Sequence, residues 1–308
     1  TGMVNFNGSN QTIPALSYYS LSSGAAGIKT LGGNITVAGS LQLNNGTIRL
    51  NGNTLTYSGN DFSFFNGNMD ASATNSKLKF TNSQIVTIPS GIFSGPVYNL
   101  EVAGTANVVS DNTFTISNNL NLVSSNFVIS DSWEVTVQES ISKTAGTAIA
   151  LGAAQDGKII FEGSSIDIGT TDNLRFNRVG AGDIQVNGNI TVNGQLELVK
   201  GIVALGSNNL TLNGTLGTIG AGAYIKTMST GKFIRKTATT GVDYLFPVGQ
   251  TYYTPIKINF TGGIGVSSSL TSRVVSGLHP QADQNVTNYA RTGYYWDCLL
   301  YTSPSPRD

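Results

Sequence analysis

Residues 34–59 read NITVAGSLQLNNGTIRLNGNTLTYSG, and residues 189–214 read NITVNGQLELVKGIVALGSNNLTLNG. Aligned without a gap, the two segments are identical at 13 of 26 positions. The identical positions are apolar residues that alternate with polar ones, together with the Gly and Asn that end each run. Alternation with a period of two predicts β-strands, and repetition of both strands and turns predicts a repeat array.

A longer unit surrounds these segments and begins each time with a strand that ends in phenylalanine. It reads MVNFNGSNQTIP at 3–14, KLKFTNSQIVTIP at 77–89 and KIIFEGSSIDIG at 158–169. One rung of short strands cannot bury its apolar face alone, whereas stacked rungs share a continuous core. The sequence therefore predicts that residues 1–226 form one stacked β-solenoid array.

The composition fits a parallel stack. Charged residues make up 11% of the 308 residues, against roughly a quarter in an average domain, and there are 37 glycines and 31 asparagines. Equivalent residues of stacked rungs lie about 4.8 Å apart, so like charges repel while Asn and Thr can hydrogen-bond along the stack. We predict an all-β fold with a parallel β-solenoid that is right-handed β-helix-like, since parallel crossovers are almost always right-handed.

The charge balance disfavours several classes of protein. Seventeen basic residues balance seventeen acidic ones, so no net field attracts nucleic acid, and no nucleic-acid partner is expected. No apolar run approaches the roughly 20 residues that span a bilayer. Cys298 has no second cysteine with which to form a disulfide. The chain begins at Thr1, and we expect it to be a piece of a larger polypeptide.

The pattern changes near Ala223, after which Tyr, Phe, Lys and Arg become more frequent. We predict a second β module at 227–297 that contains the sequence FPVG, either a cap on the stack or part of a β-sandwich. A cap is expected because the open end of a solenoid exposes strand edges that promote aggregation. The last residues, CLLYTSPSPRD at 298–308, match neither part and are expected to be a non-native tail.

Several segments resemble the repeat regions of large secreted and surface proteins of Bacteroidetes-type bacteria, namely FNGSNQTIP, KTLGGNITVAGSLQL, SQIVTIPSGIF and VYNLEVAG. FIRK and FPVGQTYYTPIKI resemble the module that often follows such repeats, and NYARTGYYWD resembles a later strand of it. CLLYTSPSPRD resembles a translated sequencing adapter at the end of a metagenomic read, so the second module is expected to be truncated. The resemblance implies export by a route that uses a C-terminal sorting domain, and it transfers no catalytic residue.

We therefore predict a secreted or cell-surface structural protein of a bacterium, a stalk or surface adhesin, and not an enzyme. No cofactor is expected. The partners of such an adhesin are extracellular glycans or a host or matrix surface. The alternative is a carbohydrate-binding or carbohydrate-degrading β-helix protein that acts through charged residues clustered on one face.

Charged residues concentrate between Asp156 and Asp183, and this stretch is the best candidate for a carbohydrate face. Solvated surface charges are the simpler interpretation, because exposed ion pairs contribute little. Aromatic rings stack on sugar rings, which adds two tyrosines to the candidates. The candidate glycan contacts are Asp167, Asp172, Arg175, Arg178, Tyr252 and Tyr253.

Other catalytic and metal signals are weak. His279, the single histidine, precedes Pro280, and we expect an exposed loop residue rather than the base of a Ser/His/Asp triad. No HExxH or EF-hand motif occurs, so no metal is expected. One calcium ion held by loop carboxylates such as Asp131 or Asp172 stays an alternative.

Overall fold

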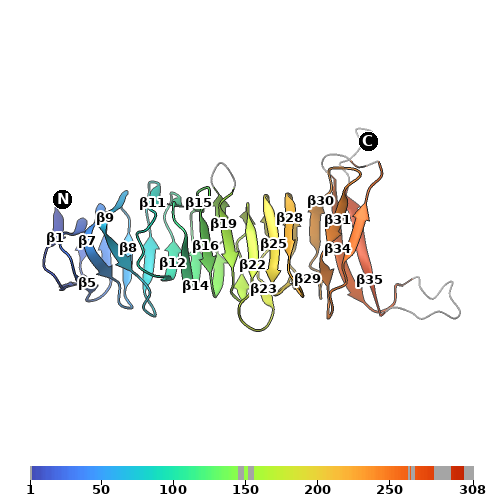
Figure 1. Cartoon of the computed structure of the whole chain (residues 1–308), viewed down its shortest axis with the longest axis horizontal. Helices are drawn as coiled ribbons and strands as arrows, with labels where there is room; N and C mark the ends of the chain where they lie inside the picture. The colour runs from blue at the N-terminus through green and yellow to red at the C-terminus, as the bar shows by residue number, and fades with distance from the viewer. Residues whose placement is uncertain are drawn as a thin grey trace. The chain divides into compact units, whose positions relative to one another are not determined.

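The structure is a computed structural model that describes residues 2–144, 149–151, 156–262, 264, 268–280 and 293–301. The described residues form β-strands joined by turns and contain no helix (Figure 1). Within these residues, nothing long, helical and apolar enough to cross a membrane is found. The chain divides into two compact units, Thr1–Arg175 (unit 1) and Phe176–Asp308 (unit 2). The prediction of an all-β fold with a parallel β-solenoid is confirmed.

The first sheet of unit 1 begins at the start of the chain and is entirely parallel. Its strands, in spatial order, are β1 (Met3–Phe6), β4 (Ser20–Ser23), β7 (Ser40–Arg49), β5 (Ile28–Leu31) and β2 (Gln11–Ile13), with β9 (Asp61–Asp70) also paired to β7. The first half of β7 pairs with β4 and its second half pairs with β5. This long strand therefore holds two short strands of the preceding rung together.

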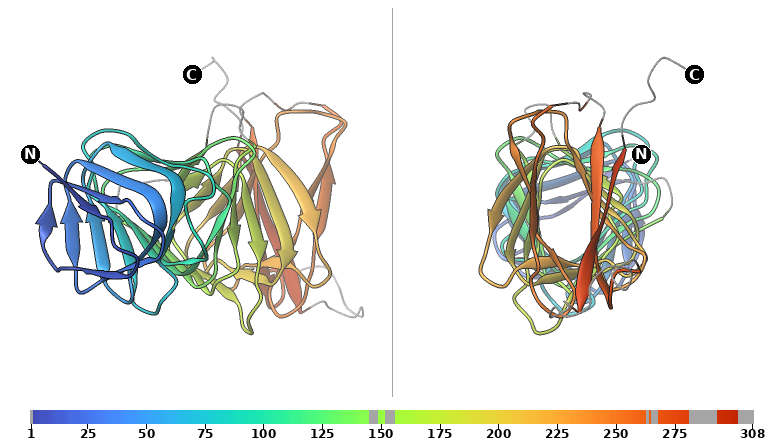
Figure 2. Two further views of the ribbon diagram at one scale, coloured as in Figure 1. Left: turned by 60° about the vertical axis from the view of Figure 1, so that its left-hand side comes forward. Right: turned by 90° about the vertical axis from the view of Figure 1, so that its right-hand side faces the viewer.

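The second sheet of unit 1 carries most of the core, and its strands lie side by side in Figure 2. It contains β3 (Ser17–Tyr18), β6 (Ile35–Val37), β8 (Thr54–Tyr57), β10 (Lys77–Phe80), β12 (Val97–Val102) and β14 (Phe114–Leu122). The two halves of β14 pair with β16 (Glu134–Val137) and β17 (Ser140–Lys143), which pair with β19 (Lys158–Phe161) and β20 (Ser165–Ile166). All of these pairs are parallel.

Equivalent residues stack on the inner side of this second sheet. We call this set the inner column: Ile35, Leu55, Leu78, Leu100, Leu120, Ile141 and Ile166. Each member pairs in register with the next, and none is more than 3% exposed. Full burial of such a side chain is worth roughly 1.5–3 kcal/mol. The alternation seen in the sequence therefore places one continuous apolar file inside the stack.

Aromatic residues fill the core beside the inner column. Phe80 is fully buried, and its ring centroid lies 6.1 Å from that of Tyr57 and 5.7 Å from that of Phe62. Phe161 is also fully buried, whereas Phe6 in the first strand is half-buried. Phe80 and Phe161 are thus inward residues of the second sheet, whereas Phe6 lies in the first sheet.

A third sheet completes the rungs of unit 1. Its parallel strands are β11 (Val86–Ile88), β13 (Val108–Ser110), β15 (Phe127–Ile129) and β18 (Ile149–Leu151). Two further short strands follow, β21 (Thr170–Thr171) and β22 (Leu174–Asn177), and the boundary between the units falls within β22.

Unit 2 continues with parallel strands and ends in antiparallel ones. One run of parallel strands is, in order, β23 (Ile184–Val186), β26 (Ile202–Ala204), β29 (Tyr224–Lys226) and β32 (Val248–Gly249). A second run is β24 (Ile190–Val192), β27 (Leu210–Leu212) and β30 (Phe233–Lys236). In addition, β25 (Gln195–Lys200) pairs in parallel with β28 (Thr215–Ile219). The antiparallel strands are β34 (Ser269–Ser276) between β30 and β35 (Tyr294–Tyr301), and β31 (Asp243–Phe246) with β33 (Ile256–Asn259).

The parallel pairing thus extends past residue 226, through β30 and β32, before the antiparallel strands begin. The proposed boundaries at 226 and 297 stay predictions. Cys298 to Tyr301, the start of the predicted tail, lie in β35 and pair with β34. Residues 302–308 of that tail, and 288–292 of the segment NYARTGYYWD, lie outside the described residues.

Candidate functional site

Several charged residues between Asp156 and Asp183 contact a residue of another strand or turn. Asp156 accepts hydrogen bonds from the backbone N and the Oγ of Ser132, at 2.5 and 3.1 Å. Asp167 Oδ1 lies 3.7 Å from Lys143 Nζ. Two further pairs are Lys158 with Glu134 at 4.0 Å in unit 1 and Asp183 with Lys226 at 2.8 Å in unit 2. Such partly exposed pairs contribute about 0–1 kcal/mol each.

The six candidate glycan contacts are divided between the two units. In unit 1, Asp167 follows β20, Asp172 follows β21 and Arg175 lies in β22, and all three are half-buried. In unit 2 are Arg178, Tyr252 and Tyr253, and Arg178 Nη2 donates to the carbonyl oxygen of Ala181 at 2.7 Å. Three of the candidates therefore belong to unit 1 and three to unit 2, and the role of all six in glycan binding stays a prediction.

The two tyrosines lie in the turn after β32 and differ in exposure. Tyr252 is 76% exposed and Tyr253 is 42% exposed. The ring centroid of Tyr253 lies 6.0 Å from that of Tyr224, and burial raises the pKa of Tyr253. Tyr252 is therefore the tyrosine whose ring is available to a ligand.

The residues considered for catalysis or metal binding come from different loops of the chain. His279 is exposed, and its ring centroid lies 5.0 Å from that of Tyr295 in an edge-on arrangement. Asp131 and Asp172 are both half-buried loop residues of unit 1. Among the described residues, no three His, Cys, Asp or Glu side chains are grouped so that they could hold a metal ion.

The outer side of the second sheet in unit 1 carries a continuous file of polar residues. We call it the polar column: Ser17, Thr36, Thr56, Lys79, Glu101, Asn121 and Ser142. Each member pairs in register with the next, at the strand spacing of about 4.8 Å. Ser142 Oγ donates to Asn121 Oδ1 at 3.1 Å, and in the adjacent file Ser140 Oγ donates to Asn119 Oδ1 at 2.5 Å. Asn and Ser side chains thus bond along the stack, as the composition predicts.

Glu101 is the most enclosed charged member of the polar column, with 9% of its surface exposed. Its Oε1 lies 2.8 Å from Lys79 Nζ and its Oε2 lies 2.9 Å from Lys77 Nζ. Burial alone would raise the pKa of Glu101, but the hydrogen bonds and charges of Lys79 and Lys77 outweigh it and hold the pKa below its ordinary value. The carboxylate of Glu101 is therefore ionised, and each of its oxygens is paired with a lysine.

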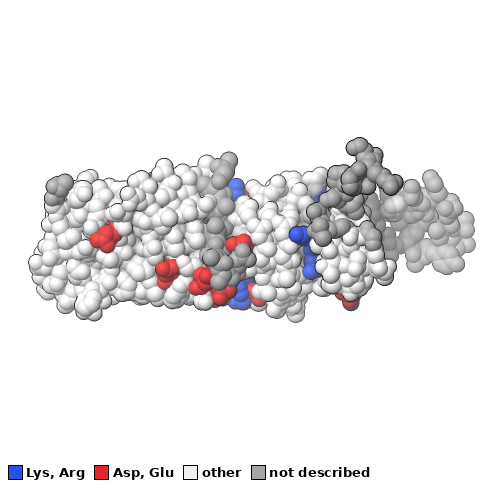
Figure 3. All heavy atoms as spheres, turned by 90° about the horizontal axis from the view of Figure 1, so that it is seen from above, with Lys and Arg blue, Asp and Glu red and all other residues white. Residues whose placement is uncertain are grey.

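Two hollows lie along this outer face, with volumes of about 560 and 320 Å³, and Lys77 lines both. Polar groups that line the smaller hollow bond to one another, as when Asn118 Nδ2 donates to Asn99 Oδ1 at 2.9 Å. On the face of the molecule that Figure 3 draws, most atoms belong to residues other than Lys, Arg, Asp and Glu, as expected for a chain with 11% charged residues. On the outer side of the second sheet, the bonds among Asn99, Asn118 and the residues of the polar column show polar side chains that hydrogen-bond to one another.

Sequence reasoning missed the cluster of Lys77, Lys79 and Glu101. A signal was present in KLKF at 77–80 and NLEV at 99–102, where polar or charged residues alternate with apolar ones and so point to opposite faces of the strand. The register between β10 and β12, which sets Lys79 opposite Glu101, depends on the length of the whole segment 81–96, which includes β11. Period-two alternation alone does not give that register.

A third hollow lies in unit 2, with a volume of about 330 Å³. We call it the aromatic pocket, lined by Gln250, Tyr252, Thr254, Val274, Ser276 and Tyr294 among others. Its residues come from the turn after β32, from β34 and from the start of β35. Sequence reasoning selected Tyr252 but could not join it to Tyr294, which lies on an antiparallel strand distant in sequence.

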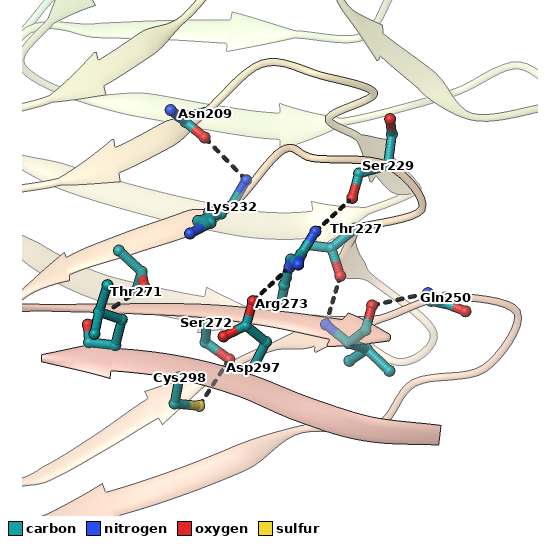
Figure 4. Close-up of polar contacts among 12 residues, drawn as sticks. Asn209, Thr227, Ser229, Lys232, Gln250, Thr271, Ser272, Arg273, Asp297 and Cys298 are labelled. Atoms are coloured by element: carbon teal, nitrogen blue, oxygen red, sulfur yellow. Dashed lines mark hydrogen bonds and ion pairs between the residues drawn. The ribbon is translucent and has the colours of Figure 1, made fainter. Parts of the chain in front are cut away.

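Hydrogen bonds fix one wall of the aromatic pocket, and Figure 4 draws them. Gln250 Nε2 donates to the carbonyl oxygen of Val274 at 2.8 Å, and the backbone N of Val274 donates to the buried Oγ1 of Thr227 at 2.9 Å. Next to this wall, Arg273 Nε lies 2.8 Å from Asp297 Oδ2, which ties β34 to β35. The wall is therefore held by both backbone and side-chain contacts.

The family of the chain follows from comparison with known proteins. Residues 28–219, which are more than half of the chain, match the TamB C-terminal domain. Comparison with curated proteins and with solved structures finds no match. The TamB match and the solenoid fold together fit a β-rich protein associated with the bacterial envelope. The chain belongs to the TamB C-terminal domain family.

Proposed function

We propose that this chain is a non-catalytic structural protein of the bacterial envelope, a cell-surface spacer or stalk within a larger polypeptide. The observation that carries the proposal is the inner column, a file of buried apolar residues from Ile35 to Ile166 that is continuous from rung to rung. Packed interiors have low compressibility, so a stack filled in this way resists deformation. Because each rung contacts only its neighbours, the number of rungs sets the length of the spacer.

The polar column supports the same role from the outer side of unit 1. Rungs are joined by parallel backbone hydrogen bonds in three sheets, and the bonds of Ser142 to Asn121 and of Glu101 to Lys79 add side-chain links between them. Detaching one rung requires these bonds to break together. An array of this kind is suited to carrying a load between two ends of a polypeptide.

The state of the carboxylates supports a role without catalysis. Glycoside hydrolysis uses two carboxyl groups, one of which is protonated so that it can act as the acid. Both oxygens of Glu101 are within 2.9 Å of a lysine Nζ, which favours the ionised form. Asp167, the central residue of the predicted charged face, lies 3.7 Å from Lys143. A degradative role for either group would require these contacts to be lost.

The packed interior favours a spacer over a lipid carrier, although lipid transport is also a role considered for envelope proteins of this family. An acyl chain requires an accessible apolar groove. The residues of the inner column are at most 3% exposed and already contact one another in register. We therefore expect that a fluorescent fatty acid does not bind to the purified chain, so that its emission does not change when the protein is added.

A force microscope tests the proposal directly, with the chain held between marker domains of known unfolding force. We expect resolved force peaks as rungs detach, and lower peaks for Phe80→Ala, which empties a fully buried site, than for Phe65→Ala, where the side chain is 78% exposed. Extension at forces no higher than those of a disordered chain would contradict the spacer role. Release of reducing sugars from purified bacterial or plant polysaccharides would contradict the absence of catalysis.

A further inference from the structure

The aromatic pocket of unit 2 exposes more aromatic surface than a spacer requires. Tyr252 is 76% exposed and Tyr294 is 37% exposed, and both line the same hollow of about 330 Å³. Trp296, which is 38% exposed, has its ring centroid 5.8 Å from that of Tyr294. Contiguous exposed apolar surface on a soluble protein commonly marks a binding site. The rings come from two segments, the turn after β32 and strand β35, that meet at this hollow.

The pocket is preformed. Trp296 Nε1 donates to the carbonyl oxygen of Thr254 at 2.9 Å, which fixes the indole ring against the turn after β32. Gln250 Nε2 is held on Val274 at 2.8 Å, and Ser276 Oγ donates to Gln250 Oε1 (Figure 4 draws the Gln250 to Val274 bond). A site whose side chains are already held loses little conformational entropy when a ligand binds.

The polar groups of the pocket suit a ligand that carries hydroxyl groups. Its lining consists of Gln, Thr, Ser, Tyr, Val and Gly, none of which is charged at neutral pH. Thr254 Oγ1 is buried and has no hydrogen-bond partner in the described part of the chain. The neighbouring charges of Arg273 and Asp297 neutralise each other at 2.8 Å. The site therefore offers stacking and neutral hydrogen bonds, and no charge to attract an anion.

We propose that the aromatic pocket binds one pyranose residue of an uncharged glycan chain, with the ring of Tyr252 stacked on the sugar face. Sugar rings combine an apolar face with hydroxyl groups at the edge, which matches aromatic rings flanked by amide and hydroxyl side chains. A volume of about 330 Å³ is at the small end for ligand pockets and accommodates one or two sugar rings. The inference is independent of the spacer role, and it gives the stalk a point of attachment.

Binding is tested with the whole chain and four uncharged oligosaccharides, namely cellohexaose, laminarihexaose, xylohexaose and chitohexaose. Saturation-transfer NMR detects contact, and isothermal titration gives Kd. For the oligosaccharide that binds, we expect Tyr252→Ala to raise Kd about tenfold or more, because the stacking ring is lost. Tyr252→Phe keeps the ring and is expected to stay within about twofold of the original Kd. Tyr19→Ala, at a tyrosine of unit 1 that is 55% exposed, is the matched control and leaves Kd unchanged.

Three outcomes would overturn the assignment. Absence of saturation transfer from the folded chain to any of the four oligosaccharides would exclude uncharged glycans as the ligand. Equal affinity of the original chain and Tyr252→Ala would place binding elsewhere. A galacturonic acid hexamer that binds more tightly than the four uncharged oligosaccharides, with binding lost at high salt, would show that the ligand is an anionic glycan and not an uncharged one. None of these results bears on the force peaks, so the inference and the spacer role fail separately.

Discussion

Glu101 lies directly opposite Lys79 on the neighbouring strand, and its Oε1 atom is 2.8 Å from the Nζ of that lysine. Lys77, two residues earlier on the same strand as Lys79, contacts the other carboxylate oxygen at 2.9 Å. One carboxylate of β12 therefore joins two lysines of β10 across a rung boundary. This arrangement neutralises two like charges that lie two residues apart on one strand.

Glu101→Gln is expected to destabilise the chain by about 1 kcal/mol, since two ion pairs are weakened while lysines that are about one-third exposed regain water. Urea unfolding followed by circular dichroism measures the change. Glu134→Gln is the control, because Glu134 is 42% exposed and 4.0 Å from its lysine. Equal effects of the two variants would show that the enclosed position of Glu101 is unimportant.

The same pair predicts a dependence of stability on pH. The pKa of Glu101 is lower in the folded chain than in the unfolded chain, so its contribution is present above the unfolded value of about 4.3. That contribution is lost as the pH falls through the lower, folded pKa. The free energy of unfolding of the original chain should therefore fall more steeply below about pH 4.3 than that of Glu101→Gln. Parallel curves for the two proteins would exclude a lowered pKa.

Phe80 and Phe65 provide a matched pair for the core. Phe80 is fully buried against Tyr57 and Phe62, whereas Phe65 is 78% exposed. We expect Phe80→Ala to cost about 3–5 kcal/mol through lost burial and the cavity that remains. Phe65→Ala should change the free energy of unfolding by less than about 0.5 kcal/mol. Thermal and urea unfolding distinguish the two, and a neutral Phe80→Ala would contradict the packed interior.

Lys29 is fully buried, and its Nζ donates to the carbonyl oxygens of Ala25, of Ala26 at 2.9 Å and of Ser9 at 3.3 Å. Burial lowers the pKa of this lysine. Lys29→Met keeps an unbranched side chain that is one atom shorter and removes the donors, so we expect a loss of about 1–3 kcal/mol. The control is Lys257→Met, where an ion pair more than half exposed is removed at little cost. Equal unfolding midpoints for Lys29→Met and Lys257→Met would contradict this expectation, because water would then satisfy the carbonyl oxygens that Lys29 contacts.

Gly59 tests how closely neighbouring rungs approach. A Cβ atom at Gly59 would overlap the carbonyl oxygen of Gly39, the equivalent turn one rung earlier. Gly59→Ala should therefore cost about 1–3 kcal/mol as the turn moves. A Cβ at Gly262 meets no atom within 4 Å, so Gly262→Ala is expected to be neutral or slightly stabilising. A neutral Gly59→Ala would indicate wider turns than the structure has.

Much of the fold could be predicted because a stack repeats its pattern. The segments at 34–59 and 189–214 share inward residues such as Leu55 and Leu210, and the structure places both at 0% exposure. The glycines that end the two segments, Gly59 and Gly214, occupy turns where a side chain has no room. Alternation and turn residues are local properties, so one sequence is enough to read them.

The rest depends on contacts between distant rungs, which local patterns do not specify. Lys29 has the sequence appearance of a surface residue, yet the turn around Ala25 encloses it. The aromatic pocket depends on the register that pairs Ser276 with Tyr294 across β34 and β35. The charged stretch from 156 to 183 was visible in the sequence, but its partners, such as Lys143 for Asp167, were not.

Distances between spin labels on the polar column test the central claim, a rigid stack of rungs in register, most directly. With Cys298→Ser as background, one label at Thr36→Cys is combined with a second at Asn121→Cys or at Ser142→Cys, which lie four and five rungs away. Pulsed electron double resonance should give two narrow distributions whose means differ by about 4.8 Å. Broad distributions, or means that do not increase with the added rung, would contradict the stacked spacer.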